Sequence, residues 1–301
     1  MAVSYWRVRI LVTNDDGVHA PGLLAVTRAL ARWAADASPE DPRQVVVAAP
    51  LANHSGAAAA VGTVYEREAV AYRSVRLEGV EGVPVYGLDA SPALSAIIGV
   101  LGGFGPRPDL IVSGINHGVN VGRSILHSGT VGATLTGAQL GVSGLAVSLR
   151  TGPEPLWWET AADVAVALLP VLAGAPARTV FNLNVPSVPP AALRGVRRGR
   201  VGPAGIIRSA ESDADMSGRA RRVAGTSSDG SEIGEIHLRL GAAIPSLGDV
   251  GDEDPEDDAS LVAAGFASLT AIIGIREDTS TGADDLMRGA LAHLQTTLEA
   301  R

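Results

Sequence analysis

The sequence predicts an α/β fold with a Rossmann-like, mostly parallel sheet flanked by helices. A near-continuous apolar run at residues 10–13 is typical of a parallel strand that is covered on both faces. A strand, a helix and a second strand then follow one another up to Pro50, which is the order of a βαβ unit. The chain has 301 residues and 46% apolar content, which is enough to bury the core of such a sheet.

The first half of the chain divides into elements by local pattern. After Pro21-Gly22, an apolar stripe at helical spacing from Leu23 predicts a helix up to Asp36, and the apolar run at residues 45–49 predicts the second strand. Apolar and polar residues alternate between 63 and 88, which predicts an antiparallel excursion. A short helix is expected after Ser91, where proline stands at its first position.

The second half continues the alternation of strands and helices and then changes character. Strands are expected at 109–113, 144–148 and 179–185, and an amphipathic helix at 158–172. Beyond residue 186, alternation at 235–240 predicts a β-hairpin, followed by an acidic loop at 249–258, a return strand at 268–275 and a last helix at 284–298. We therefore predict a Rossmann-like catalytic core at 1–186 and an extension at 187–301.

Polar side chains follow the first two strands at their carboxyl ends. Asp15 and Asp16 come directly after the first strand, and ligands of open α/β sheets bind at this edge. Adjacent carboxylates are tolerated where a cation or solvent compensates their repulsion. Ser55 follows the second strand and is a candidate ligand. The competing interpretations are an Asn-Asp-Asp-Gly turn and a turn or capping serine.

The segment 113–134 is rich in glycine and asparagine. Closely spaced glycines allow backbone N–H groups to approach a ligand, and a helix that begins near Ser128 would direct its positive end at an anion. Asn116 and Asn120 offer neutral oxygens or amide donors. An ordinary loop with Ser128 as the helix cap explains the same residues.

Composition and charge narrow the function classes. The absence of cysteine excludes disulfides and thiolate metal sites but leaves an oxygen-ligated cation possible. The net charge of −8 argues against a nucleic-acid-binding surface. Four arginines cluster between 194 and 200, which is more typical of a solvated or intersubunit face than of a nucleic-acid site. The first nine residues lack an apolar signal core and no apolar run could span a bilayer, so a cytoplasmic protein is expected.

Together these motifs resemble the SurE family, the survival-protein 5'-nucleotidases. The matching segments are Thr13-Asn14-Asp15-Asp16-Gly17, Ala20-Pro21-Gly22, Ala49-Pro50, Ser55-Gly56, residues 113–122, residues 128–133 and Asn182-Leu183-Asn184-Val185-Pro186. The resemblance implies a metal-dependent phosphomonoesterase. Such an enzyme hydrolyses nucleoside 5'-monophosphates, and possibly 3'-monophosphates, to nucleoside and phosphate.

The resemblance also implies a set of site residues. One divalent cation per subunit, Mg²⁺ or Mn²⁺, would be held by Asp15, Asp16, Ser55 and Asn116, with Asp15, Asp16 and Asn116 as the catalytic residues. Asn120, Ser128, Gly129 and Thr130 would bind the substrate phosphate. The residue chemistry agrees, because carboxylate, hydroxyl and amide oxygens suit these hard cations.

The family further implies a homodimer or homotetramer in which the last strand and helix are exchanged between subunits. No membrane and no stable nucleic-acid partner are expected. Simple packing of the last helix on its own core is the alternative to exchange. The amphipathic pattern of residues 284–298 fits both arrangements.

Three positions depart from the family pattern. His127 stands where the family usually has tyrosine, Thr136 replaces an acidic residue, and Ala90-Ser91-Pro92 replaces Gly-Thr-Pro. These changes leave open a second function class, a catalytically weak nucleotide- or partner-binding protein that keeps the fold and the metal site. A haloacid-dehalogenase-type phosphatase is disfavoured because Asn14-Asp15-Asp16 offers no Asp-x-Asp. An NAD dehydrogenase is disfavoured because the two acids would meet the pyrophosphate.

Overall fold

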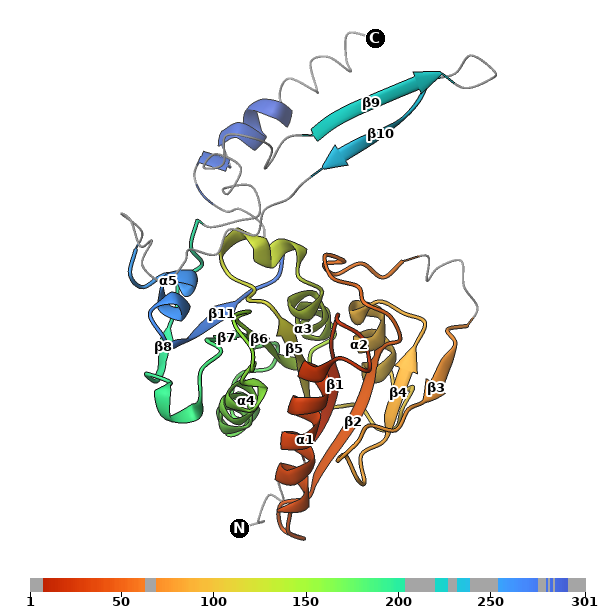
Figure 1. The fold of residues 1–301 in the computed structure, drawn as a ribbon, viewed down its shortest axis with the longest axis vertical. Helices are drawn as coiled ribbons and strands as arrows, with labels where there is room; N and C mark the ends of the chain where they lie inside the picture. Colours follow the sequence, from red (N-terminus) through yellow and green to blue (C-terminus); the bar gives the residue numbers. More distant parts are fainter. Residues whose placement is uncertain are drawn as a thin grey trace.

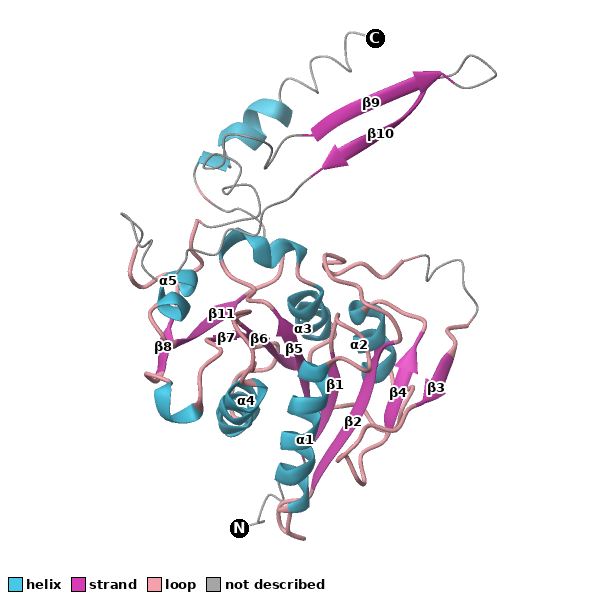
Figure 2. Cartoon of the chain, in the orientation of Figure 1, coloured by secondary structure: helices cyan, strands magenta, loops and turns pink. Residues whose placement is uncertain are grey.

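The computed structural model describes residues 8–62, 69–203, 220–226, 232–238, 254–275, 280, 282–283 and 285–291. Its main feature is a nine-stranded sheet with helices on both faces (Figure 1 and Figure 2). The strands of this sheet are β1 (Val8–Thr13), β2 (Arg43–Pro50), β3 (Tyr72–Ser74), β4 (Val85–Leu88), β5 (Leu110–His117), β6 (Ser143–Leu149), β7 (Val180–Val185), β8 (Val196–Arg198) and β11 (Ala267–Ile272). The helices around it are α1 (Pro21–Ala35), α2 (Pro92–Val100), α3 (Gly129–Gln139), α4 (Trp158–Ala173) and α5 (Asp258–Ala263).

The order of the strands is β3-β4-β2-β1-β5-β6-β7-β11-β8. From β4 to β7 every neighbouring pair is parallel, whereas β3 and β11 run antiparallel to β4 and β7. Parallel strands place their carboxyl ends at one edge of the sheet, so the loops after β1, β2 and β5 meet there. The mostly parallel α/β fold expected from the sequence is confirmed.

The alternation of side chains along each strand feeds two cores. Ile10 and Val12 of β1 belong to the core cluster formed with α1 and α4, and Leu11 belongs to the cluster on the other face, formed with α2 and α3. All three side chains are fully buried. A strand covered on both faces needs apolar residues at successive positions, which explains the unbroken run at the start of the chain.

The expected antiparallel excursion at 63–88 is wrong in part. β3 pairs with β4 in antiparallel fashion, but β4 pairs in parallel with β2 and so belongs to the main sheet. Alternation indicates that the two faces of a strand differ in exposure, and it does not indicate strand direction. Residues 63–68 of this prediction lie outside the described residues.

The segment after residue 186 contributes to the same sheet. The return strand β11 pairs with β7, and β8 pairs with β11. The expected hairpin is present as β9 (Ala220–Thr226) and β10 (Glu232–Leu238), which stand apart from the nine-stranded sheet (Figure 1). Residues 285–291 of the expected last helix are helical, and residues 292–298 lie outside the described part. The division at residue 186 and the exchange of this helix between subunits stay predictions.

Candidate functional site

Two loops and one strand end are joined by hydrogen bonds at the carboxyl edge of the sheet. The backbone N–H of His54, in the loop after β2, donates to the carbonyl oxygen of Asp15 at 2.6 Å. The backbone N–H of His117, at the end of β5, donates to Asp16 Oδ2 at 2.9 Å. Ser55 and Asn116 are the chain neighbours of these two donors. The structure therefore brings together the loops after β1 and β2 and the end of β5, which carry the four expected metal ligands.

Asp15 lies against the start of α3. Its side chain is 3% exposed, and Oδ1 accepts a 2.6 Å hydrogen bond from Thr130 Oγ1. A Cβ added to Gly129 would lie 2.7 Å from the Cβ of Asp15 and 2.9 Å from Oδ2. Only glycine at position 129 permits this approach. The positive end of α3 thus faces the carboxylate, as it would face any anion bound beside it.

The electrostatics of Asp15 favour a positively charged ligand. Burial raises the pKa of Asp15, and the hydrogen bonds from Thr130 oppose this while the charge of Asp16 adds to it. Within the described part of the chain, no arginine or histidine side chain forms an ion pair with this carboxylate. A bound cation would offset both the burial and the repulsion between the two acids.

The remaining expected ligands supply neutral oxygens. The Asn116 side-chain amide donates from Nδ2 to the carbonyl oxygen of Gly118 at 2.6 Å, which leaves Oδ1 as its acceptor atom. Ser55 is exposed, and its backbone N–H donates to Asn53 Oδ1 at 2.7 Å in a turn. Among the described residues, no three His, Cys, Asp or Glu side chains gather as a metal site. The oxygen set of two carboxylates, a hydroxyl and an amide is the donor chemistry that fits Mg²⁺ or Mn²⁺.

Three of the expected phosphate-binding residues already have hydrogen-bond partners in the protein. Ser128 caps α3, since its Oγ accepts from the N–H of Val131 at 3.1 Å, as the competing interpretation held. The Asn120 side-chain amide donates to Ser148 Oγ at 2.8 Å. Thr130 uses its hydroxyl on Asp15. The assignment of these residues to the phosphate stays a prediction.

The Asn-Leu-Asn segment of β7 has a role that the sequence did not reveal. Asn184 Oδ1 accepts from the N–H of Asn120 at 2.7 Å, and the side-chain amides of Asn182 and Asn184 donate to the carbonyl oxygen of Asn120 at 2.8 and 3.0 Å. The segment therefore clamps the backbone of the loop after β5. Its repeat of asparagines was visible in the sequence, but its partner was not.

A second residue missed by sequence reasoning is Asp258, at the start of α5. Its buried carboxylate accepts hydrogen bonds from the backbone N–H groups of Gly122, Gly202 and Ala259. Burial raises the pKa of Asp258, and these N–H donors oppose the shift. In the sequence this residue was one of several acids in an expected loop, and nothing distinguished it from the others.

Two of the positions that depart from the family pattern, His127 and Thr136, lie in or next to α3. The His127 side chain is exposed, and its carbonyl oxygen accepts from the N–H of Ala58 at 3.2 Å. The Thr136 hydroxyl donates within α3 to the carbonyl oxygen of Gly132 at 2.7 Å. Neither side chain contacts Asp15 or Asp16 through a described hydrogen bond.

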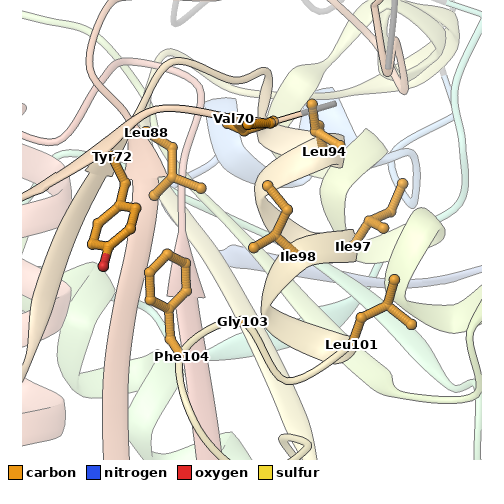
Figure 3. Close-up of a pocket in the computed structure, with 10 residues that line it drawn as sticks. Val70, Tyr72, Leu88, Leu94, Ile97, Ile98, Leu101, Gly103 and Phe104 are labelled. Carbon is orange, nitrogen blue, oxygen red and sulfur yellow. The ribbon is translucent and has the colours of Figure 1, made fainter. Parts of the chain in front are cut away.

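An apolar pocket of about 400 Å³ lies beside α2, and Figure 3 shows side chains of β3, β4 and α2 converging on it. Its lining residues are Ala69, Val70, Tyr72, Leu88, Leu94, Ile97, Ile98, Leu101, Gly103 and Phe104. None of the expected site residues lines it, and it offers no carboxylate or cationic side chain.

Known proteins are similar to this chain in sequence and in fold. The family model described as "Survival protein SurE" matches residues 10–206. The 5'/3'-nucleotidase SurE of Cronobacter sakazakii is 39% identical over 197 residues, covering 65% of this chain and 70% of the relative. The 5'-nucleotidase SurE of Chloroflexus aggregans is 38% identical over 196 residues, covering 64% and 72%.

The fold is also that of a solved structure. The crystal structure of the SurE protein from Aquifex aeolicus matches with a TM-score of 0.62 and 24% identity, covering 93% of this chain and 99% of that one. This similarity extends beyond residue 206 to the C-terminal elements. The family model, which matches well over half of the chain, and the nucleotidase relatives agree with the geometry of the edge loops, and the chain therefore belongs to the survival protein SurE family.

Proposed function

We infer that this chain is a nucleoside monophosphatase that depends on one divalent cation per subunit, Mg²⁺ or Mn²⁺. Its substrates are nucleoside 5'-monophosphates and, in addition, 3'-monophosphates. The SurE family membership and the names of the nucleotidase relatives support the reaction class. The observation that carries the metal dependence is Asp15, a buried carboxylate beside Asp16 with no cationic partner among the described side chains.

Each residue of the edge has a role in this proposal. Asp15, Asp16, Ser55 and Asn116 would hold the ion, which when bound polarises a phosphoryl oxygen and lowers the pKa of a water. Thr130 holds the Asp15 carboxylate in one orientation through its hydroxyl. The start of α3, made accessible by Gly129, favours the negative charge of a phosphate.

The same proposal covers the assembly and the partners. The protein acts in the cytoplasm as a homodimer or homotetramer and has no stable nucleic-acid partner. The arginine cluster supports the last point. Arg194 and Arg197 lie over the Phe266 ring at 4.5 and 3.8 Å, and Arg200 pairs with Asp254 at 3.2 Å and with Glu256 at 3.1 Å. No helix in the described ranges has the length and apolar character that a membrane crossing requires.

A hydrolysis panel tests the function. The chain is stripped with EDTA, reloaded with Mg²⁺ or Mn²⁺, and assayed for phosphate release from the 5'- and 3'-monophosphates of four nucleosides and from an aryl phosphate. We expect turnover that requires the metal and disappears in Asp15→Asn. The second candidate, a catalytically weak binding protein, predicts nucleotide binding by calorimetry with no turnover above that of the variant.

A further inference from the structure

Asp258 lies far along the chain from every expected site residue. The family model ends at residue 206, and Asp258 belongs to the short helix α5 beyond it. Its side chain is 0% exposed, although a carboxylate is costly to bury without partners. The partners that satisfy it are backbone N–H groups from three separate places in the chain.

The main partner of Asp258 is the loop that follows β5. The N–H of Gly122 points between the two carboxylate oxygens, at 3.1 Å from Oδ1 and 2.9 Å from Oδ2. The N–H of Gly202 donates to Oδ1 at 3.2 Å, and the N–H of Ala259 donates to the same atom at 3.0 Å. The carboxylate therefore joins the loop after β5 to the segment after β8.

Asp258 is not needed to start its own helix. The preceding residue, Asp257, performs that task, since its Oδ1 accepts from the N–H of Ser260 at 2.6 Å. The bonds of Asp258 to Gly122 and Gly202 lead away from α5. Asp257 thus caps α5, whereas the adjacent Asp258 contacts the distant loop.

The chain that follows Gly122 enters the candidate site within eight residues, at Thr130. Gly122 is the first residue of the 3₁₀ helix Gly122–His127, and the next residue, Ser128, caps α3. Two residues further on, Thr130 donates to Asp15. On the other side of Gly122, Asn120 is clamped by the asparagines of β7. The segment 118–128 is thus fixed at one point by β7 and at another by Asp258.

We propose that Asp258 is a positioning residue for the nucleotidase site, through which the C-terminal part of the chain holds the segment 118–128 in place. This inference rests on the proposed function for its catalytic consequence and on the hydrogen bonds alone for its structural part. The site would then depend on a residue outside the matched family region.

Amide hydrogen exchange of the full chain tests the structural part. Asp258→Ala removes every acceptor, and Asp258→Asn keeps one oxygen for Gly122. Asp257→Ala is the matched control, because it weakens the start of α5 without touching Gly122 by a described bond. We expect exchange within 118–128 to rise about tenfold to a hundredfold in Asp258→Ala, as for the loss of a hydrogen bond to a charged group, and less in Asp258→Asn. Unchanged exchange in both variants overturns the proposal.

Kinetics test the catalytic part. A displaced loop costs up to about a hundredfold in rate when reacting groups lose their alignment. We expect Asp258→Ala to lower kcat by about tenfold or more with KM changed less, Asp258→Asn to recover part of kcat, and Asp257→Ala to keep kcat. Equal kcat in Asp258→Ala and Asp257→Ala overturns the positioning role.

One outcome separates this proposal from the proposed function. If the wild-type chain hydrolyses none of the phosphates, the proposed function fails, and Mn²⁺ affinity measured by calorimetry replaces kcat. Outer partners of metal ligands typically change metal affinity by about tenfold to a hundredfold. A weaker Mn²⁺ affinity in Asp258→Ala than in Asp257→Ala supports the positioning role, and equal affinities overturn it.

Discussion

Two buried aspartates, Asp15 at the edge of the sheet and Asp258 at α5, show how differently a fold can use the same side chain. Burial raises the pKa of both carboxyls. The Asp258 oxygens accept hydrogen bonds from backbone N–H groups of two distant segments, at Gly122 and Gly202, and of Ala259. The Asp15 carboxylate accepts from the hydroxyl and the backbone N–H of Thr130 and from its own backbone N–H. Because Asp258 bonds to segments that lie far apart in the sequence, it fixes the position of the chain around it. Asp15 faces a second acid and keeps the capacity to bind a cation.

The largest effect on hydrolysis is expected at Asp15, the carboxylate that faces a second acid. Asp15→Asn should lower metal-dependent hydrolysis by more than about a hundredfold, because the metal contributes several kcal/mol to the transition state. The unfolding free energy of the metal-free protein should stay equal or rise, since the amide keeps an oxygen for Thr130 and carries no buried charge. Phosphate release and urea unfolding measure the two quantities.

Asp163→Asn, at an exposed position of α4, is the matched control for charge. It should leave both quantities unchanged. Turnover of Asp15→Asn equal to the wild type at saturating Mg²⁺ or Mn²⁺ would remove Asp15 from the ligand set.

At Asp258 the expected effect is on stability. Asp258→Ala leaves the buried N–H groups of Gly122 and Gly202 without an acceptor, which should lower the unfolding free energy by about 2–4 kcal/mol. Urea unfolding of the metal-free chain measures this loss. A stability equal to the wild type would mean that water replaces the carboxylate and that the contrast with Asp15 is false.

Gly129→Ala tests the close approach between the start of α3 and Asp15. The new Cβ would lie 2.7 Å from the Cβ of Asp15, so either the helix or the carboxylate must shift. We expect a loss of about 1–3 kcal/mol in unfolding free energy, together with lower kcat/KM. Gly152→Ala is the control, because nothing lies within 4 Å of its added Cβ and its φ is not positive. Equal stability of the two variants would contradict the close approach.

The pH dependence of stability tests the raised pKa at α5. Because burial raises the pKa of Asp258 above 3.8, the folded chain holds this proton more tightly than the unfolded chain. Stability should therefore fall as pH rises from about 4 through the folded-state pKa, and stay level above it. Asp258→Asn lacks this titration, so the difference between the two unfolding curves isolates it. A difference that does not vary with pH would show that the N–H donors fully offset burial.

The smallest effect on activity is expected at His127, beside the carboxyl edge of the sheet. His127 is exposed and replaces the tyrosine that the family usually carries. His127→Tyr should raise the preference among nucleobases by a factor of about two to ten, the range of an added aromatic contact. The ratio of kcat/KM for two nucleotides and an aryl phosphate measures this preference. Identical ratios in the two proteins would show that residue 127 takes no part in base recognition.

Local patterns were sufficient for the elements and for the edge loops. The apolar run at β1 and the acids after it follow from rules that act over a few residues, and so do the cap at Ser128 and the helix after it. The direction of β4 was missed because parallel and antiparallel strands can show the same alternation of apolar and polar residues. The partner of the asparagines in β7 was missed because that contact joins residues 62 to 64 positions apart. Asp258 was missed for the same reason.

The bond between Gly122 and Asp258 also bears on how the protein is made. It closes a loop of 136 residues, and contacts across such a separation form late in folding. A chain emerging from the ribosome can assemble β1, β5 and α3 before α5 has been synthesised, because domains begin to fold from the N-terminus. The acids at the edge would then be in place while the neighbouring loop is still free. The site is thus expected to be complete only after α5 has been synthesised, so that a chain terminated before residue 258 would carry its acids without a fixed loop beside them.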